Sequence, residues 1–178
     1  MKKLEKLSHR ELAVFLSNYL RENGIATVLT GGACVTIYTR NRYESFDLDF
    51  VNVADVPLVK IAAALEEIGF VRDGRIFVHE KVKYAIDILN PPLSIGEEKV
   101  TRVQTIAHKK MVLQLLSPTD SVKDRLAAFY FWNDLQALEQ ALMVARDQEI
   151  DLADVRGWSK REGELPKFKT FQKKLQSR

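Results

Sequence analysis

Three aspartates lie in segments that otherwise have the pattern of buried strands. Asp47 and Asp49 alternate with apolar residues in FDLDF, and Asp87 interrupts the apolar run YAIDIL. Because strand side chains alternate between two faces, Asp47 and Asp49 should point to the same side. Two carboxylates about 4 Å apart repel by roughly 4 kcal/mol at an effective dielectric constant of about 20. The pair therefore needs a cation beside it, either a divalent metal or a nearby arginine such as Arg40 or Arg42.

Asp87 stands alone in its own segment. A carboxylate in an apolar strand either faces a polar cleft or bonds to an arginine or a helix terminus. If the two strands are neighbours, the three aspartates would supply the oxygen ligands that Mg²⁺ prefers and leave positions for phosphates and water. Zinc is disfavoured, since the chain has one cysteine and three scattered histidines. Taken singly, the Asp-x-Asp motif and Asp87 also fit structural ion pairs.

A glycine pair, Gly31 and Gly32, follows the apolar segment IATVL and opens a short predicted helix. Glycines let backbone NH groups approach a phosphate closely, and a helix N-terminus adds partial positive charge. Alone, such a pair is usually only a turn. Followed by an Asp-x-Asp strand and a later strand with a single aspartate, it favours a phosphate site, to which the Thr30 hydroxyl could contribute.

The segments LTGGACVTIYTRNRYESFDLDF and AIDIL resemble the nucleotidyltransferase superfamily, which has a polymerase-beta-like palm. That family's signature joins a Gly-Gly or Gly-Ser pair to two acids one residue apart and to a third acid on a later strand. The stretch RYESFDLD, with Arg42 and Ser45, is most similar to abortive-infection and toxin-type nucleotidyltransferases. More faintly, Lys123 and Asp134 resemble the Lys and Asp of the family's helical part.

The resemblance implies transfer of a nucleoside monophosphate from a nucleoside triphosphate to a hydroxyl, with release of pyrophosphate. Asp47 and Asp49 would hold two Mg²⁺ ions, with Mn²⁺ as an alternative, and Asp87 would complete the second site and help to deprotonate the hydroxyl. The implied nucleotide-binding residues are Thr30, Gly31, Gly32, Arg42, Ser45 and Lys123.

Several of these residues also have ordinary interpretations. Arg42 could only balance the aspartates, and Lys123 could be a solvated helix residue. Asp134, on the polar face of a helix, could be solvated or ion-paired. Phe129 and Trp132 share a helix face, which favours core packing over stacking on a base.

The elements that would carry the aspartates form a mixed α/β half. The capping box SHRE predicts a helix from about Ser8 to Asn23, and a second helix follows Pro57. The Asp73-Gly74 pair predicts a tight hairpin turn. Strands are predicted in IATVL, FDLDFV, YAIDIL and VTRVQTI.

From residue 107 the periodicity becomes helical. One long helix is predicted to run to about Arg146, with a shorter helix around DLADVRGW and another after Pro166. We therefore predict an α+β fold, in which a nucleotidyltransferase-type mixed sheet with flanking helices spans residues 1–106. A helical subdomain over residues 107–178 packs on it.

Charge is unevenly distributed along the 178 residues. Residues 156–178 contain eight basic and two acidic side chains, although the whole chain has a net charge of only +3. This basic region could be a solvated helix face or a surface that meets RNA phosphates. No apolar run approaches the ~20 residues of a membrane span, so we expect a cytoplasmic protein without membrane contact.

The leading hypothesis is a metal-dependent nucleotidyltransferase that acts on RNA, including the end of a tRNA, on a protein or on a small molecule. It could act as a component of a toxin-antitoxin pair. The alternative is a non-catalytic protein of the same fold that binds nucleotide or a partner protein. A sugar-nucleotide glycosyltransferase also uses Asp-x-Asp, but the 46 residues before Asp47 are fewer than that fold normally needs for its nucleotide.

Overall fold

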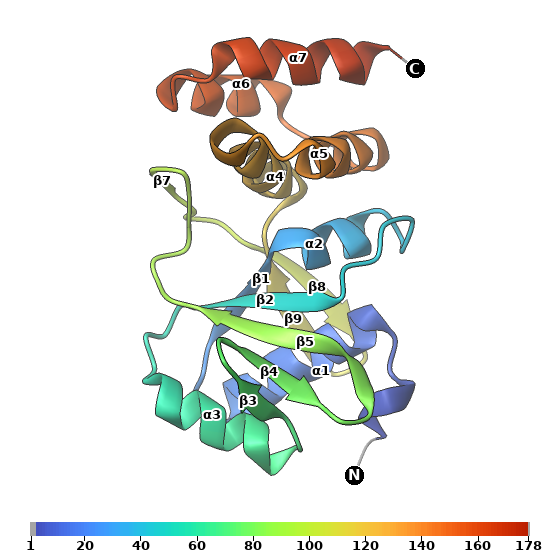
Figure 1. Ribbon diagram of the computed structural model, residues 1–178, viewed down its shortest axis with the longest axis vertical. Coiled ribbons are helices and arrows are strands. Elements are labelled where there is room, and N and C mark those ends of the chain that lie inside the picture. Colours follow the sequence, from blue (N-terminus) through green and yellow to red (C-terminus); the bar gives the residue numbers. More distant parts are fainter. Residues whose placement is uncertain (1–2, 178) are drawn as a thin grey trace.

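The computed structural model describes residues 3–177, and its centre is a mixed seven-stranded sheet (Figure 1). The strand order is β3-β4-β5-β2-β1-β9-β8. β2 pairs with β5 and β1 pairs with β9 in parallel, and the other neighbours are antiparallel. The strands are β1 (Thr27–Thr30), β2 (Asp47–Asn52), β3 (Val71–Asp73), β4 (Ile76–His79), β5 (Val82–Leu89), β8 (Gln104–His108) and β9 (Met111–Leu115). The predicted α+β class is confirmed.

Helices cover both faces of the sheet. As Figure 1 shows, α1 and α3 lie below the sheet, and α2 lies above it, beneath the stack formed by α4 to α7. A small hairpin, β6 (Ser94–Ile95) and β7 (Glu98–Lys99), stands apart from the main sheet. The helices are η1 (Leu4–Lys6), α1 (His9–Glu22), α2 (Gly31–Tyr38), α3 (Leu58–Glu67), α4 (Pro118–Trp132), α5 (Leu135–Asp147), α6 (Leu152–Arg161) and α7 (Leu165–Gln176).

Local signals in the sequence account for several of these boundaries. Ser8 accepts from the Glu11 backbone and Glu11 bonds back to the Ser8 backbone, which is the predicted capping box at the start of α1. The turn between β3 and β4 has Gly74 at φ +59°, as the predicted hairpin requires. In β2, Leu48 and Phe50 are fully buried, so the intervening positions face the opposite side of the sheet.

The sheet extends further along the chain than the sequence predicts. The boundary predicted after residue 106 lies inside β8, and β9 then returns to the sheet beside β1, with Leu29 opposite Leu115. In MVLQL, Leu113 and Leu115 are buried on alternate positions, which is the pattern of a strand. The helical half therefore begins at Pro118.

The single long helix predicted to reach Arg146 is two helices. Asn133 adopts the left-handed conformation, with φ +53°, and ends α4. Asp134 then caps α5 by accepting a hydrogen bond from the Ala137 backbone NH at 3.0 Å. Asn133 thus ends α4, and the next residue, Asp134, caps the start of α5.

The two halves share one hydrophobic core, which contains Leu48 of the sheet, Cys34 of α2, Leu126 of α4 and Trp158 of α6. The cysteine of this core, Cys34, is fully buried. Among the helices of residues 3–177, none has the length and apolar character needed to cross a membrane.

Candidate active site

The three aspartates lie on one face of the sheet. In the parallel pairing of β2 with β5, Asp49 is directly opposite Asp87, and in the antiparallel pairing of β1 with β2, Thr30 is opposite Asp49. Asp47 precedes Asp49 by two residues and therefore points to the same side. β2 and β5 are therefore neighbours, which is the condition under which the three acids could share one site.

Asp49 occupies the centre of this group. Burial raises the pKa of its carboxyl to about 7, and the neighbouring charges of Asp47 and Asp87 act in the same direction. The guanidinium of Arg125, on α4, opposes this increase. The attraction of Arg125 is therefore too weak to offset the burial of Asp49 and its repulsion by Asp47 and Asp87.

The glycine pair at the start of α2 lies against these acids. Gly31 has φ +65°, and a Cβ atom there would fall 2.2 Å from Asp49 Oδ2. A Cβ atom on Gly32 would fall 3.0 Å from Ser45 Oγ. Close approach of Asp49 and Ser45 to the chain is therefore a structural reason for both glycines, in addition to the predicted contact with phosphate.

Two hydroxyl groups predicted to bind nucleotide already have partners within the site. Ser45 is buried, and its hydroxyl donates a hydrogen bond to Asp47 Oδ1. Thr30 Oγ1 donates to the main-chain oxygen of Asp49 at 3.3 Å. These bonds help to position the two aspartates.

Asp87 is paired with Arg75, a partner that the sequence does not predict. Arg75 Nη2 lies 2.9 Å from Asp87 Oδ2, and the side chain of Arg75 is 82% exposed while that of Asp87 is 5% exposed. The other oxygen, Asp87 Oδ1, is buried without a hydrogen-bond partner. The available signal was the hairpin turn at Asp73-Gly74, which brings Arg75 to the strand beside β5.

Arg125 is a second residue whose place beside the aspartates the sequence does not predict. Its guanidinium bonds to Asp124 Oδ2 at 2.6 Å and to Gln140 Oε1 at 3.4 Å, and its charge acts on Asp49. Arg125 follows Lys123 by two residues on α4. The helical half therefore contributes a cation to the site, from a different position than predicted.

Arg42 and Lys123 have other partners. Arg42 forms an ion pair with Asp147 at the end of α5. Lys123 is buried, and its ammonium lies 3.0 Å from Glu98, 2.7 Å from Asp154 and 3.6 Å from Asp120. The structure does not bring either cation into an ion pair with the three aspartates.

The other candidate residues of the helical half, Asp134, Phe129 and Trp132, also have structural explanations. Asp134 is the N-cap of α5, which explains its position at a break between helices. Phe129 is buried, in agreement with core packing, but Trp132 is 83% exposed. Trp132 is the last residue of α4, so no further turn of that helix covers it.

Among residues 3–177, no group of three or more His, Cys, Asp or Glu side chains is arranged to hold a metal ion. The donor set nevertheless fits a hard divalent cation, since all three acids offer carboxylate oxygens. Two observations support the fit: the unpartnered buried oxygen of Asp87 and the raised pKa of Asp49. Release of Asp87 from Arg75 and of Asp47 from Ser45 would complete the set.

Comparison of the chain with protein-family models and with curated proteins finds no match. The resemblance to nucleotidyltransferases therefore depends on the motifs and their arrangement alone.

Proposed function

We propose that this protein is a metal-dependent nucleotidyltransferase with a polymerase-beta-like palm, of the abortive-infection or toxin type. The observation that carries the proposal is the register of the central strands, which puts Asp87 directly beside Asp49 with Asp47 on the same face. The motif order supports it, since the glycine pair leads into α2 immediately beside Asp49. The reaction would move a nucleoside monophosphate from a nucleoside triphosphate to a hydroxyl.

In this proposal Asp47, Asp49 and Asp87 would hold two Mg²⁺ ions, with Mn²⁺ as an alternative. The bound metal would stabilise charge on the entering and leaving oxygens. The backbone NH groups at Gly31 and Gly32 would bind phosphate oxygens at the N-terminus of α2.

Basic side chains around the site would have supporting roles. Arg125 would stay in place and limit repulsion among the carboxylates. Arg75, being exposed, would exchange Asp87 for a phosphate. Arg42 and Lys123 would reach the nucleotide only by leaving their present acidic partners.

The acceptor in the proposal is a hydroxyl of RNA, including tRNA, of a protein or of a small molecule. RNA is favoured by the basic residues of α6 and α7, which include Lys160, Arg161, Lys173 and Lys174 in their last turns. A cognate partner protein, in the manner of a toxin-antitoxin pair, and a cytoplasmic location belong to the same proposal.

A second candidate function is non-catalytic binding of a nucleotide or a partner protein. The ion pair between Arg75 and Asp87 favours it, because it neutralises one of the three acids without any metal. In that case the aspartates would serve to organise the strands.

A transfer assay distinguishes the two candidates. Wild-type protein, Asp49→Asn and Asp87→Asn are incubated with α-labelled nucleoside triphosphates, Mg²⁺ and total RNA, and Glu66→Gln on α3 serves as an exposed-acid control. We expect label on RNA with wild type and control, and a loss of about 100-fold or more in both aspartate variants. Calorimetric binding of nucleotide without transfer to RNA, protein or small molecules would favour the second candidate. Absence of both transfer and binding would contradict the proposal.

A further inference from the structure

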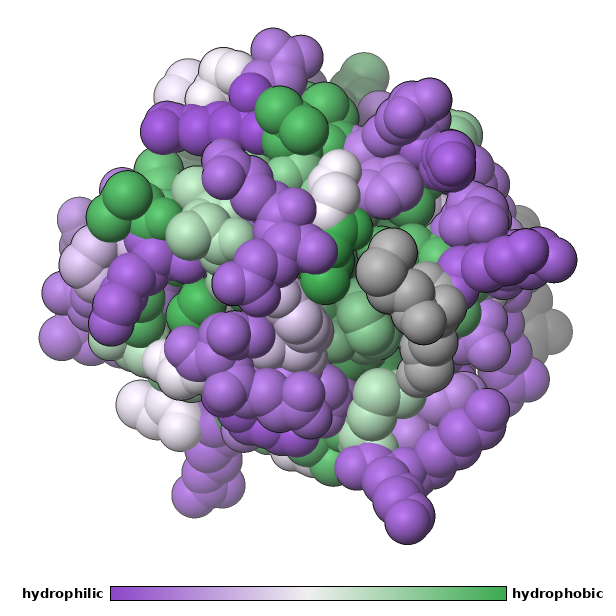
Figure 2. Space-filling view, turned by 90° about the horizontal axis from the view of Figure 1, so that it is seen from below, coloured by the Kyte–Doolittle hydropathy of each residue, from purple (hydrophilic) through white to green (hydrophobic). Residues whose placement is uncertain are grey.

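A cavity of about 370 Å³ lies on the side of the sheet opposite the aspartates. Its lining comes from the N-terminal segment, from Phe15 of α1, from Ile68 at the end of α3 and from the end of β4. Figure 2 looks onto this end of the molecule, where apolar side chains lie among hydrophilic ones. The volume is within the range of small-molecule sites, about 300–1,000 Å³.

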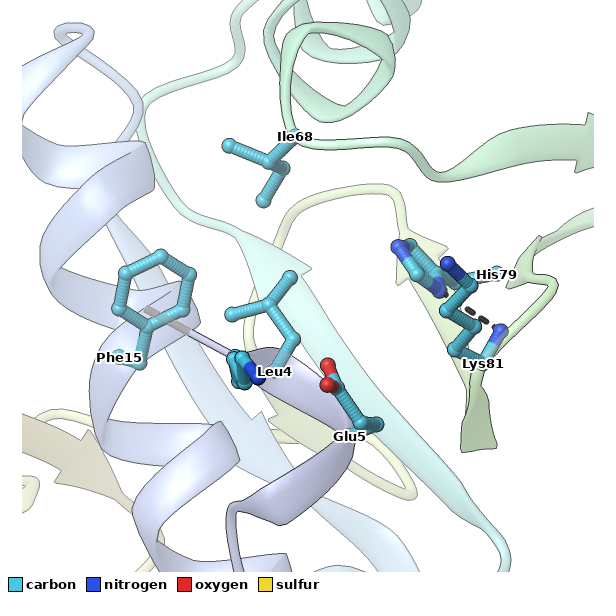
Figure 3. Close-up of a pocket in the computed structure, with 7 residues that line it drawn as sticks. Leu4, Glu5, Phe15, Ile68, His79 and Lys81 are labelled. Carbon is cyan, nitrogen blue, oxygen red and sulfur yellow. Dashed lines mark hydrogen bonds between the residues drawn. The ribbon is translucent and has the colours of Figure 1, made fainter. Parts of the chain in front are cut away.

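One side of the cavity is apolar. Figure 3 shows Leu4, Phe15 and Ile68 across the cavity from His79 and Lys81. Leu4 is buried, and its segment packs on β5. This side offers a surface that would exclude water from a hydrocarbon chain or ring.

The opposite side presents an imidazole in a defined orientation. His79 Nδ1 accepts a hydrogen bond from the Lys81 backbone NH at 3.0 Å, so the neutral ring carries its proton on Nε2. The ring packs against Phe70, with centroids 5.1 Å apart. A Cβ atom on Gly69 would fall 2.8 Å from His79 Nε2, so the glycine leaves room for the ring.

The charged groups around the cavity favour an anion. Lys3 and Lys81 line it, and within residues 3–177 neither ammonium has an ion-pair partner. Glu5 is the acid of the lining, so these three side chains leave one net positive charge. His79 Nε2 adds a hydrogen-bond donor on the same side as Lys81 (Figure 3).

We propose that this cavity binds a small monoanion with an apolar body, in the class of medium-chain carboxylates. The carboxylate would contact Lys81 and the Nε2 proton of His79. The apolar body would lie along Leu4, Phe15 and Ile68. This inference is independent of the proposed transferase activity, since it uses the other face of the sheet.

Calorimetry with sodium octanoate tests the proposal, with octylammonium chloride as the probe of opposite charge. We expect one octanoate per chain, and binding of octylammonium at least about tenfold weaker. Lys81→Met, which keeps an apolar stem, should weaken octanoate binding about fivefold. Lys110→Met, in the turn between β8 and β9, should leave it unchanged. Equal binding of the two probes, equal binding by the Lys81 variant, or no octanoate binding would overturn the proposal.

A second measurement needs no variant and so does not depend on folding of the mutants. With octanoate bound to the wild type, we expect nuclear Overhauser contacts between its methylene protons and both the Ile68 methyl groups and the Phe15 ring. Binding without these contacts would place the anion elsewhere and refute the site.

Discussion

Asp49 is the central aspartate of the three. It lies between Thr30 and Asp87 across the sheet, and Gly31 closes the space in front of its carboxylate. The unfolded chain imposes no such surroundings, so the raised pKa of Asp49 arises only on folding. Ionisation of this residue therefore opposes folding.

This repulsion predicts how stability depends on pH in the absence of divalent cations. The folded pKa of Asp49, about 7, lies above its ordinary value of 3.8. Its contribution to stability is full below the ordinary value and is lost as pH rises to about 7. Asp49→Asn, which cannot ionise, should gain roughly 2 to 4 kcal/mol over wild type above that pH. Urea unfolding in the presence of a chelator, across this pH range and with Glu66→Gln as control, measures this gain. A stability difference between Asp49→Asn and wild type that is the same at all pH values would contradict the prediction.

Arg75 should compete with metal ions for Asp87. Replacement by Gln removes the guanidinium from Asp87 Oδ2 and leaves a buried carboxylate that needs another cation. We expect Mg²⁺ affinity to increase about threefold, a small change because Arg75 is exposed. Calorimetric titration of Mg²⁺ into Arg75→Gln measures this change in affinity. Arg72→Gln, on β3, is the control. Weaker Mg²⁺ binding by the Arg75 variant would show that Arg75 supports the site instead.

At the scale of residues, the sequence predicts the aspartates better than their partners. Alternation within FDLDF places Asp47 and Asp49 on one face from local geometry alone. Arg75 and Arg125 reach the acids through strand pairing and helix packing, which no short pattern encodes. For the same reason the sequence does not predict that Arg42 pairs with Asp147, or Lys123 with Glu98 and Asp154, which are distant in sequence.

At the scale of elements, the boundaries that depend on local chemistry are the ones the sequence predicts. The capping box of α1 and the Asp73-Gly74 turn are examples. By contrast, β9 was not predicted, because a five-residue apolar run followed by Pro118 also fits a helix start. The sequence does not predict the break between α4 and α5, because the helical periodicity continues across Asn133, which ends one helix, and Asp134, which caps the next.

The turn from β1 into α2 tolerates no side chain at Gly31. Gly31→Ala combines a left-handed backbone with a contact of 2.2 Å to Asp49, whereas Gly24→Ala has a similar backbone, with φ +76°, and open space. We expect Gly24→Ala to cost about 1 kcal/mol and Gly31→Ala clearly more, with displacement of Asp49. Denaturant unfolding of both variants measures the difference. Equal losses would mean that Asp49 moves aside freely.

Lys123 joins α4 to α6 and to the β6–β7 hairpin. Its ammonium balances Glu98, Asp120 and Asp154, and Lys123→Met would leave these acids facing one another. We expect a loss of about 3 kcal/mol in unfolding free energy. Lys174→Met, in an exposed pair with Glu139, should cost less than about 1 kcal/mol. A small effect of Lys123→Met would instead leave this cation free to serve a nucleotide.

At the scale of the whole molecule, α2 joins the sheet to the helical half. The Tyr38 hydroxyl donates to the carbonyl of Leu116 at the end of the sheet. The Tyr38 carbonyl accepts from Gln148 Nε2 at 2.7 Å, just after α5. These bonds and the shared core tie the two halves together. The sheet half and the helical half therefore differ in architecture, but we do not expect either to be stable without the other.

The shared core predicts one cooperative unfolding transition. Both tryptophans are in the helical half, and Trp158 is buried, so its fluorescence reports on that half, while circular dichroism reports on the whole chain. We expect the two signals to give the same denaturation midpoint. Midpoints that differ would show that the halves unfold separately.

The position of β9 has a consequence for synthesis of the chain. β1 has β2 on one side and β9 on the other, yet β9 is made more than 80 residues later. A nascent polypeptide that has completed β5 already contains every carboxylate of the site, but one edge of β1 stays open until Met111–Leu115 leaves the ribosome. During that interval the strand TVLT has unpaired backbone groups, which are open to pairing with another chain.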